Sequence, residues 1–500
     1  MDHGTGPTRL KDGLETRQSN ELTLHRPELT PSTAGTRDTE RRTEIAIVGA
    51  GLAGLVAAKR LGEAGAAPHV YEASYRSGGR IMTEREPRTG QVFELGGEFI
   101  DSNNERLLVL LEELGLEKED LYVEESVQLA PVFFLCGAPY DSVSLDAGLS
   151  PIRAAARHDA SVIGHSAAST GSSEEALALD RLSARDWIDS RVPGGIETPL
   201  GHLLDVAYTM ESGAETSDLS AIVLLSMLGD EQSKSTLGLF GASDERYCVR
   251  GGVECIIHGL TRELTRDVQF GHRLVSAATD RNSVRLTFDV EGRAREVVAN
   301  HVVITIPFTT LRSVDLTRLD LSDLKRTAIA ELGMGVNVKL FLEFAAPYWR
   351  ALDCSGETYS DIGYQCTWQK SSSGENDPAI LVNYRGGKAA LELEKLSADQ
   401  AARRFLSQIE PVLPGISQWW TGRALLGTWS SSPFSKGSYS YSRLGQLTMF
   451  NGIEGTAEGR VHFAGEHTCH EFRGYMEGAV RSGERVATEV LQARHSQRSG

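Results

Sequence analysis

Residues 44–84 read EIAIVGAGLAGLVAAKRLGEAGAAPHVYEASYRSGGRIMTE, and this stretch decides the fold. The apolar run at 45–48 predicts a strand buried on both faces. It leads into a G-x-G-x-x-G motif at 49–54, after which small and apolar residues recur at helical spacing. A second apolar run ends at Glu72, about 20 residues after the glycines. This order of strand, glycine turn, helix, strand and acid predicts a dinucleotide-binding unit.

The residues of this unit have separate physical roles. Gly49 permits the tight turn, Gly51 lets a pyrophosphate approach the backbone, and Gly54 lets the helix pack closely on the strand. The free N–H groups and the dipole at the helix N-terminus favour the phosphate charge. Glu72 is placed to accept hydrogen bonds from the adenosine ribose.

A second glycine element, S-G-G-R at 77–80, follows shortly after Glu72. Its Arg80 supplies a permanent cation beside the first glycine turn. Gly79 and Arg80 resemble the G-G-R that flavoproteins of the amine oxidase family place beside the FAD pyrophosphate. Nicotinamide enzymes do not usually have this element, so the resemblance implies FAD as the cofactor.

Composition narrows the class of protein. A chain of 500 residues with 40% hydrophobic residues is long enough for more than one core. The net charge of −17 argues against nucleic acid as a partner, because phosphates would be repelled. No apolar run is long enough to span a membrane. The six cysteines are scattered without a C-x-x-C motif, which is typical of reduced thiols in a cytoplasmic protein.

The expected fold class is α/β: a Rossmann-like FAD-binding domain with a second, α+β substrate-binding domain, both built from discontinuous segments. Residues 1–42 are polar and lack periodicity, which predicts a disordered extension. The FAD-binding domain is expected at 43–100, 245–310 and 425–500. The substrate-binding domain is expected at 101–244 and 311–424, with a helical part at about 150–240 that includes an Ala/Ser-rich stretch at 150–180.

The segment FELGGEFID at 93–101 contains a second glycine pair. Paired glycines after an extended run indicate close approach of the backbone to a ligand. The segment resembles the L-G-G of flavin-dependent amine oxidases, which passes the flavin ring, and this implies that Gly96 and Gly97 contact the cofactor. Asp101 has two interpretations: it faces a substrate ammonium, or it is the N-cap of the helix predicted from the leucine stripe after it.

Lys339 lies in the run NVKLFLEF, where alternation puts it on the face opposite Val338, Leu340 and Leu342. Judged by the alternation alone, a single lysine in such a strand is typically a solvated residue at the edge of a sheet. However, relatives in the amine oxidase family have a strand lysine followed by P-Y-W, as at 347–349 here. The resemblance implies that Lys339 holds a water molecule against the flavin.

The remaining expected site residues come from the same resemblance. Tyr439 and Tyr475 match the two walls of an aromatic cage, and Ser438 stands where mitochondrial relatives have a cysteine bonded to FAD, so FAD is expected to bind non-covalently. The positive end of the helix after Tyr475 is expected to face the flavin. The other residues assigned to the cofactor are Leu274, Trp429, Gly465, Glu466 and Met476. His467, Cys469 and His470 are too close together for a tetrahedral site, and no metal is expected.

The expected activity is FAD-dependent oxidation of a primary amine, diamine or polyamine to an imine, with O2 giving H2O2 and water hydrolysing the imine to an aldehyde. An L-amino acid oxidase is the alternative, although no arginine follows the L-G-G to clamp a carboxylate. A desaturase-type enzyme and a non-catalytic flavin-binding scaffold remain open. The expected partners are a small amine and O2, without nucleic acid or membrane, and a homodimer is a candidate assembly.

Overall fold

The computed structural model describes residues 41–86, 90–122, 129–164, 173–231, 236–370, 378–450 and 452–498. The extension predicted at 1–42 lies outside these ranges except for its last two residues, which begin strand β1 (Arg41–Val48). Part of the Ala/Ser-rich stretch, at 165–172, is also outside them. Helices α3 (Ser142–Gly164) and α4 (Glu174–Arg181) flank it.

The first sheet has the strand order β12-β9-β10-β11-β1-β2, and β20 also pairs with β11. Strands β2, β1, β11 and β20 are parallel to their neighbours in this part of the sheet. The apolar run of β1 is buried, as predicted from the sequence. The other strands are β2 (His69–Tyr71), β9 (Arg273–Asp280), β10 (Ser283–Val290), β11 (Arg293–Ile304), β12 (Asp315–Arg318) and β20 (Val461–Phe463).

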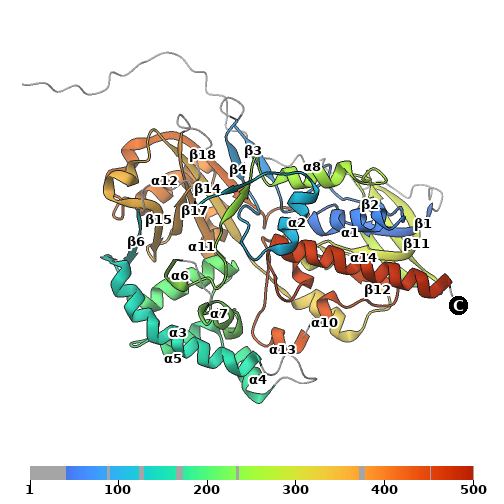
Figure 1. Cartoon of the computed structure of the whole chain (residues 1–500), viewed down its shortest axis with the longest axis horizontal. Helices are drawn as coiled ribbons and strands as arrows, with labels where there is room; N and C mark the ends of the chain where they lie inside the picture. Colours follow the sequence, from blue (N-terminus) through green and yellow to red (C-terminus); the bar gives the residue numbers. More distant parts are fainter. Residues whose placement is uncertain are drawn as a thin grey trace, which may run out of the picture. The chain divides into compact units, whose positions relative to one another are not determined.

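Helices from both ends of the chain cover this sheet. Helix α1 (Leu52–Glu63) lies along α14 (Met476–Arg498), as the blue and red ribbons of Figure 1 show. The contact is close because Gly483 has no side chain: a Cβ there would lie 2.6 Å from the Ala53 carbonyl oxygen. Helices α2 (Glu105–Glu113) and α8 (Glu254–Arg262) contribute to the same core.

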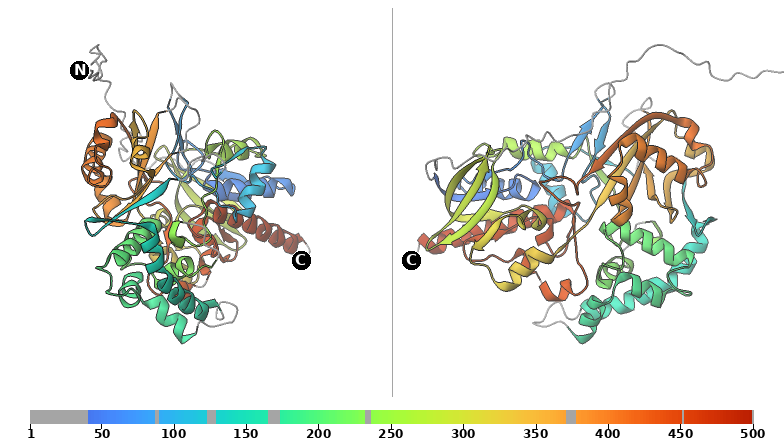
Figure 2. Two further views of the ribbon diagram at one scale, coloured as in Figure 1. Left: turned by 60° about the vertical axis from the view of Figure 1, so that its left-hand side comes forward. Right: turned by 180° about the vertical axis from the view of Figure 1, so that it is seen from behind.

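The second sheet has the order β18-β14-β17-β16-β15-β6-β7. Its strands are β6 (Ala130–Leu135), β7 (Ala138–Tyr140), β14 (Asn337–Phe344), β15 (Cys354–Ser360), β16 (Gln365–Gln369), β17 (Ala379–Gly386) and β18 (Trp420–Thr428). One apolar core joins it to helices α3, α5 (Ala184–Arg191), α6 (Pro199–Ser212) and α7 (Ala221–Leu228). Another joins it to α11 (Gly387–Leu393) and α12 (Ala398–Ile409). The second view in Figure 2 shows the two sheets as separate bodies of strands within residues 41–498.

Strand β14 lies inside the second sheet, between β17 and β18. Lys339 is therefore not an edge residue: it pairs with Tyr384 on one side and Gly427 on the other. The predicted alternation is present, because Val338 and Leu340 pack toward α11 and α12 while Phe341 packs with the L-G-G segment. Lys339 thus points into the interior, toward the L-G-G segment.

The division into two domains stays a prediction. Within the described residues, strand β12 pairs with β9, and helix α10 (Asp323–Glu331) packs on the same core through Ala328. The first sheet and its helices therefore continue past residue 310, where the sequence placed a boundary. Among the described helices, none is both long and apolar enough to cross a membrane.

Candidate active site

The first glycine turn has no room for a side chain at Gly49 or Gly54. Gly49 has φ +108°, and a Cβ there would lie 2.5 Å from Thr305 Oγ1. A Cβ on Gly54 would lie 2.1 Å from the Gly49 carbonyl oxygen. Gly51 faces the second glycine element, where Gly79 has φ +58° and a Cβ would lie 3.4 Å from Gly51 Cα. These two bare backbones make a cradle that suits a pyrophosphate.

Glu72 is held at the mouth of this cradle. One carboxylate oxygen accepts the Ala50 N–H at 2.8 Å, and the other accepts the N–H and the hydroxyl of Ser74, both at 2.8 Å. A carboxylate can accept about four hydrogen bonds, so capacity for a ribose remains. The Glu72 N–H donates to the Gln269 carbonyl, which brings the segment before the buried Leu274 alongside.

Arg80 and Glu466 form a buried ion pair at 2.7 Å. Arg80 also donates to the Ser438 carbonyl at 2.7 Å, while Ser440 Oγ and the Gly474 N–H donate to Glu466 Oε2 at 2.7 and 2.9 Å. Burial by itself would raise the pKa of Glu466, but the Arg80 charge and these donors outweigh it and lower the pKa to about 2. Glu466 is therefore ionised at all ordinary pH values and fixes the arginine.

The L-G-G segment packs against three other residues assigned from the sequence. A Cβ on Gly96 would lie 1.8 Å from the Arg80 carbonyl oxygen and 3.2 Å from Trp429 Cζ2. A Cβ on Gly97 would lie 2.9 Å from the sulfur of Met476, the first residue of α14. Five predicted cofactor residues from distant parts of the chain are thus in contact.

Lys339 makes three contacts from its ammonium group. Its Nζ donates to the carbonyl oxygens of Glu94 and Gly96 at 3.1 and 3.0 Å, and to Glu98 Oε2 at 2.7 Å. Only about a tenth of either side chain in the Lys339–Glu98 pair is exposed. Because a lysine ammonium has three N–H donors, these acceptors satisfy it. The predicted water contact therefore requires Lys339 to exchange one acceptor for water.

Tyr439 and Tyr475 meet at Glu211, near the C-terminus of α6. The Tyr439 hydroxyl donates to the Glu211 carbonyl and bonds the Tyr384 hydroxyl at 2.9 Å. The Tyr475 hydroxyl donates to Glu211 Oε1 at 3.3 Å. Burial raises the pKa of both tyrosines well above the ordinary value, so both rings are neutral phenols.

Two further acids lie close to Glu211. Burial raises the pKa of Glu211 to about 7, opposed by the Tyr475 hydrogen bond and reinforced by Asp101. The Glu245 side chain keeps a solvent-accessible surface, and the protein around it, together with repulsion from Glu211 and Asp101, raises its pKa to about 8. Strong pKa shifts of this kind cluster at functional sites. We call Asp101, Glu211 and Glu245 the acidic cluster.

Asp101 is not the N-cap of α2, because the cap residue is Asn104. Its Oδ1 instead accepts the Ser243 hydroxyl at 2.8 Å and the N–H groups of Asp244 and Glu245 at 3.0 and 2.8 Å. Asp101 therefore holds the loop that carries Glu245. Asp101 thus contributes a negative charge to the cluster and fixes the position of the loop that carries Glu245.

Sequence reasoning did not assign Glu98, Glu211 or Glu245 to the site. A signal for Glu211 was present: it is an acid after the mostly apolar stretch VAYTM at 206–210, where a charge needs a reason. Glu98 follows L-G-G directly, and its partner Lys339 lies 241 residues further along the chain. No pattern in the sequence around Glu245 indicates that it belongs to the site.

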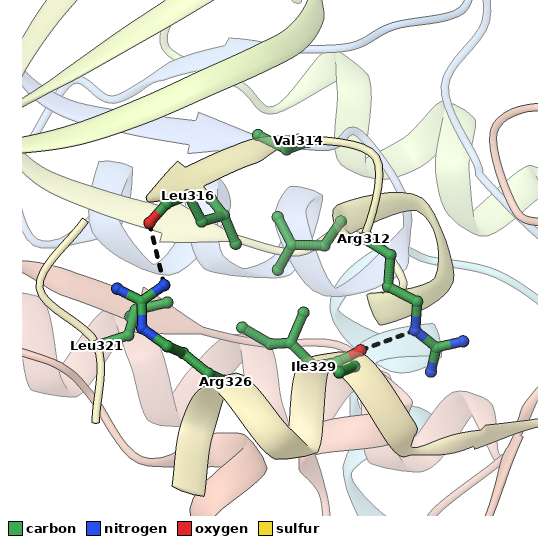
Figure 3. Close-up of a pocket in the computed structure, with 8 residues that line it drawn as sticks. Arg312, Val314, Leu316, Leu321, Arg326 and Ile329 are labelled. Atoms are coloured by element: carbon green, nitrogen blue, oxygen red, sulfur yellow. Dashed lines mark hydrogen bonds between the residues drawn. The ribbon is translucent and has the colours of Figure 1, made fainter. Parts of the chain in front are cut away.

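A cavity of about 360 Å³ lies elsewhere, between β12 and α10. Figure 3 shows Arg326 donating to the Leu316 carbonyl and Arg312 donating to the Ile329 carbonyl at its edges. Its lining is mostly aliphatic and includes none of the residues assigned above. The cavity is therefore separate from the candidate active site.

Known proteins resemble this chain over most of its length. The model of the family described as flavin containing amine oxidoreductase matches residues 52–491. A putative L-amino-acid oxidase of Bacillus subtilis is 26% identical over 89% of this chain and 94% of its own length. Putrescine oxidase of Kocuria rosea is 26% identical over 91% of this chain and 96% of its own length.

Solved structures share the fold. A putrescine oxidase bound to putrescine superposes with a TM-score of 0.77 at 21% identity, over 91% of this chain and 100% of that one. Cyclohexylamine oxidase from Brevibacterium oxydans also gives a TM-score of 0.77 at 21% identity, over 90% of this chain and 99% of that one.

Proposed function

Because the chain belongs to the flavin-containing amine oxidoreductase family and is thus an FAD-dependent enzyme acting on amines, we propose that its substrate is a diamine or polyamine. The observation that carries this proposal is the acidic cluster beside Tyr439 and Tyr475. The overall change converts R–CH2–NH2, O2 and H2O into R–CHO, NH3 and H2O2. For a secondary amine, the smaller amine leaves in place of NH3.

The residues present fit the cofactor. Gly51 and Gly79 leave the space for the pyrophosphate, Glu72 has acceptor capacity for the ribose, and Arg80 supplies the cation. When bound, FAD supplies the acceptor for the two electrons of the amine C–H bond and passes them to O2. Ser438 has a buried hydroxyl that donates to Asn337, not a thiol, so FAD is bound non-covalently in this proposal.

The two phenols orient the reacting amine. Tyr439 is fixed by the Glu211 carbonyl and Tyr384, and Tyr475 is fixed by the Glu211 carboxylate. Neither ring has to reorganise when a substrate enters, so both can present their π faces to an amino group. The desolvation that keeps the phenols neutral also favours the neutral form of the reacting amine, which has a lone pair.

Lys339 and Glu98 supply a fixed charge pair beside Gly96. In this proposal the Lys339 Nζ exchanges its longest contact, the one to the Glu94 carbonyl at 3.1 Å, for a water molecule that serves the step with O2. Glu98 then keeps the ammonium in place. The pair contributes charge placement, not substrate binding.

The acidic cluster selects for a second positive charge. An ammonium about 4 Å from a carboxylate near a protein surface gains about 4 kcal/mol before desolvation costs. The carboxylate of an amino acid would be repelled instead. The two cations described at the site, Arg80 and Lys339, are already paired with Glu466 and Glu98. This arrangement favours a diamine over the L-amino acid alternative.

A peroxide assay over matched substrates tests the proposal. Purified enzyme is assayed with a diamine, the monoamine of the same chain length, and the amino acid that carries a carboxylate at the same distance. The proposal predicts the highest kcat/KM for the diamine and the lowest for the amino acid. A preference for the amino acid would overturn it and favour the L-amino acid oxidase alternative.

A further inference from the structure

Three side chains with metal-binding chemistry meet in the part of the chain that carries the second sheet. Cys136 is at the tip of the β6–β7 hairpin, His202 is in the first turn of α6, and Asp361 directly follows β15. One candidate ligand atom from each residue lies within 4.8 Å of the other two. The three residues are far apart in the sequence, so they form no recognisable metal-binding motif.

Asp361 is already fixed at the centre of this group. Its Oδ2 accepts the Cys136 N–H at 2.9 Å and lies 2.7 Å from His202 Nδ1. Among the residues that the structure describes, its Oδ1 is buried and has no hydrogen-bond partner. A buried carboxylate oxygen without a donor is costly and requires an explanation, and a bound cation would supply one.

His202 has a carboxylate near each ring nitrogen, and binding a metal through Nδ1 would replace its contact with Asp361 Oδ2. Its Nδ1 faces Asp361, while its Nε2 lies 3.7 Å from Glu197 Oε2. Metal-binding histidines usually donate the second ring N–H to a carboxylate, which fixes the tautomer. Glu197 is mostly exposed, so a small rotation would complete this bond.

We propose that Cys136 Sγ, His202 Nδ1 and a carboxylate oxygen of Asp361 bind one Zn²⁺ ion, with a water molecule as the fourth ligand. Thiolate, imidazole and carboxylate together are the donor set that zinc prefers. The two negative charges of the thiolate and carboxylate balance the ion. This site is independent of the amine oxidase chemistry, and it departs from the expectation of no metal drawn from the sequence.

To bind one zinc ion, the three ligand atoms must move slightly closer together. Ligand atoms of a tetrahedral zinc site are about 3.5 Å apart, which follows from bonds of about 2.0 to 2.3 Å. The ligand atoms now lie within 4.8 Å of one another, so the required movement is about 1 Å. Cys136 can make this movement because it is an exposed residue at a hairpin tip. The ion would then clamp this hairpin and the loop after β15 to helix α6.

Cobalt binding to the full chain tests the site directly. Enzyme without an affinity tag is freed of metal with a chelator, dialysed and titrated with Co²⁺. The expected result is one Co²⁺ per chain, with a cobalt–thiolate charge-transfer band that stoichiometric Zn²⁺ abolishes. Absence of the band, or binding well below one ion per chain, would overturn the proposal.

Variants separate this site from adventitious binding. Cys136→Asn removes the thiol without straining the turn, because Cys136 has φ +52° and asparagine tolerates that region well. It should abolish the band, and Glu197→Gln should weaken Zn²⁺ binding about 10- to 100-fold. Cys255→Ser, which removes a half-buried thiol elsewhere, is the control and should bind as the unmodified chain does. Retention of the band in Cys136→Asn would refute the assignment.

Discussion

Glu211→Gln should convert the enzyme from one that prefers diamines to one that discriminates weakly between diamines and monoamines. The substitution keeps the size of the side chain and an oxygen for the Tyr475 hydroxyl, which donates at 3.3 Å. It removes the charge that pairs with the distal ammonium. A hydrogen bond to a charged group contributes about 1.5–3 kcal/mol, which corresponds to a loss of about 10- to 150-fold in kcat/KM for the diamine.

The pH dependence makes this prediction sharper. Burial raises the pKa of Glu211 to about 7. The carboxylate is therefore about one-tenth ionised at pH 6 and about nine-tenths ionised at pH 8. Because only the ionised form attracts the ammonium, the diamine-to-monoamine ratio of kcat/KM should rise about tenfold between these values. Taking the ratio cancels the protonation of the reacting amine.

The assay is initial-rate peroxide formation with the two substrates at pH 6, 7 and 8. In Glu211→Gln the ratio should be low and should lose most of its rise with pH, leaving only the share of Glu245, whose pKa is raised to about 8. Glu215→Gln is the matched control, since Glu215 bonds the Lys388 N–H at 2.9 Å instead of the cage. Equal losses for diamine and monoamine, or a ratio that ignores pH in the unmodified enzyme, would refute the reasoning.

Three further predictions concern the cofactor and the charge pair. Acid-precipitated enzyme should release all its FAD into the supernatant because Ser438 cannot form a thioether, and yellow colour in the pellet would contradict this. Lys339→Met should slow flavin reoxidation by O2, measured by stopped flow, at least tenfold more than it weakens amine binding; unchanged oxygen kinetics would remove its assigned role. Asp101→Asn should raise KM for diamines more than for monoamines, because the cluster loses a charge while the amide oxygen can still accept the Ser243 hydroxyl; equal effects would assign Asp101 to the loop alone.

Local patterns predicted the nucleotide side of the molecule well. The glycine turn, the strand before it and the helix after it depend on neighbouring residues, so residues 45–63 are sufficient to specify them. The same holds for the alternation around Lys339. That Lys339 has a role in the site, instead of being a solvated edge lysine, followed from the family resemblance alone, because period-2 alternation does not say whether a strand has one neighbour or two.

The acidic cluster could not be predicted in the same way. Glu245 approaches Glu211 only after the loop at 243–245 has folded onto the Asp101 carboxylate. The raised pKa of Glu211 results from burial, which is a property of the tertiary structure. The bond from Lys339 to Glu98 joins strand β14 to the segment that follows L-G-G. Contacts of this kind join residues that are distant in sequence, so no periodicity or motif spacing in the sequence indicates them.

The packing of α14 on α1 has a consequence for biosynthesis. The candidate active site combines Gly51 with Glu466, which pairs with Arg80, and with Met476, which contacts Gly97. Gly483 lets α1 and α14 lie in close contact. During translation the segment around Gly51 and α1 must wait with an uncovered apolar surface until residues 466–483 leave the ribosome. Supply of the cofactor at that moment would shift the balance from aggregation toward the native state, so yield in a host should follow its riboflavin status.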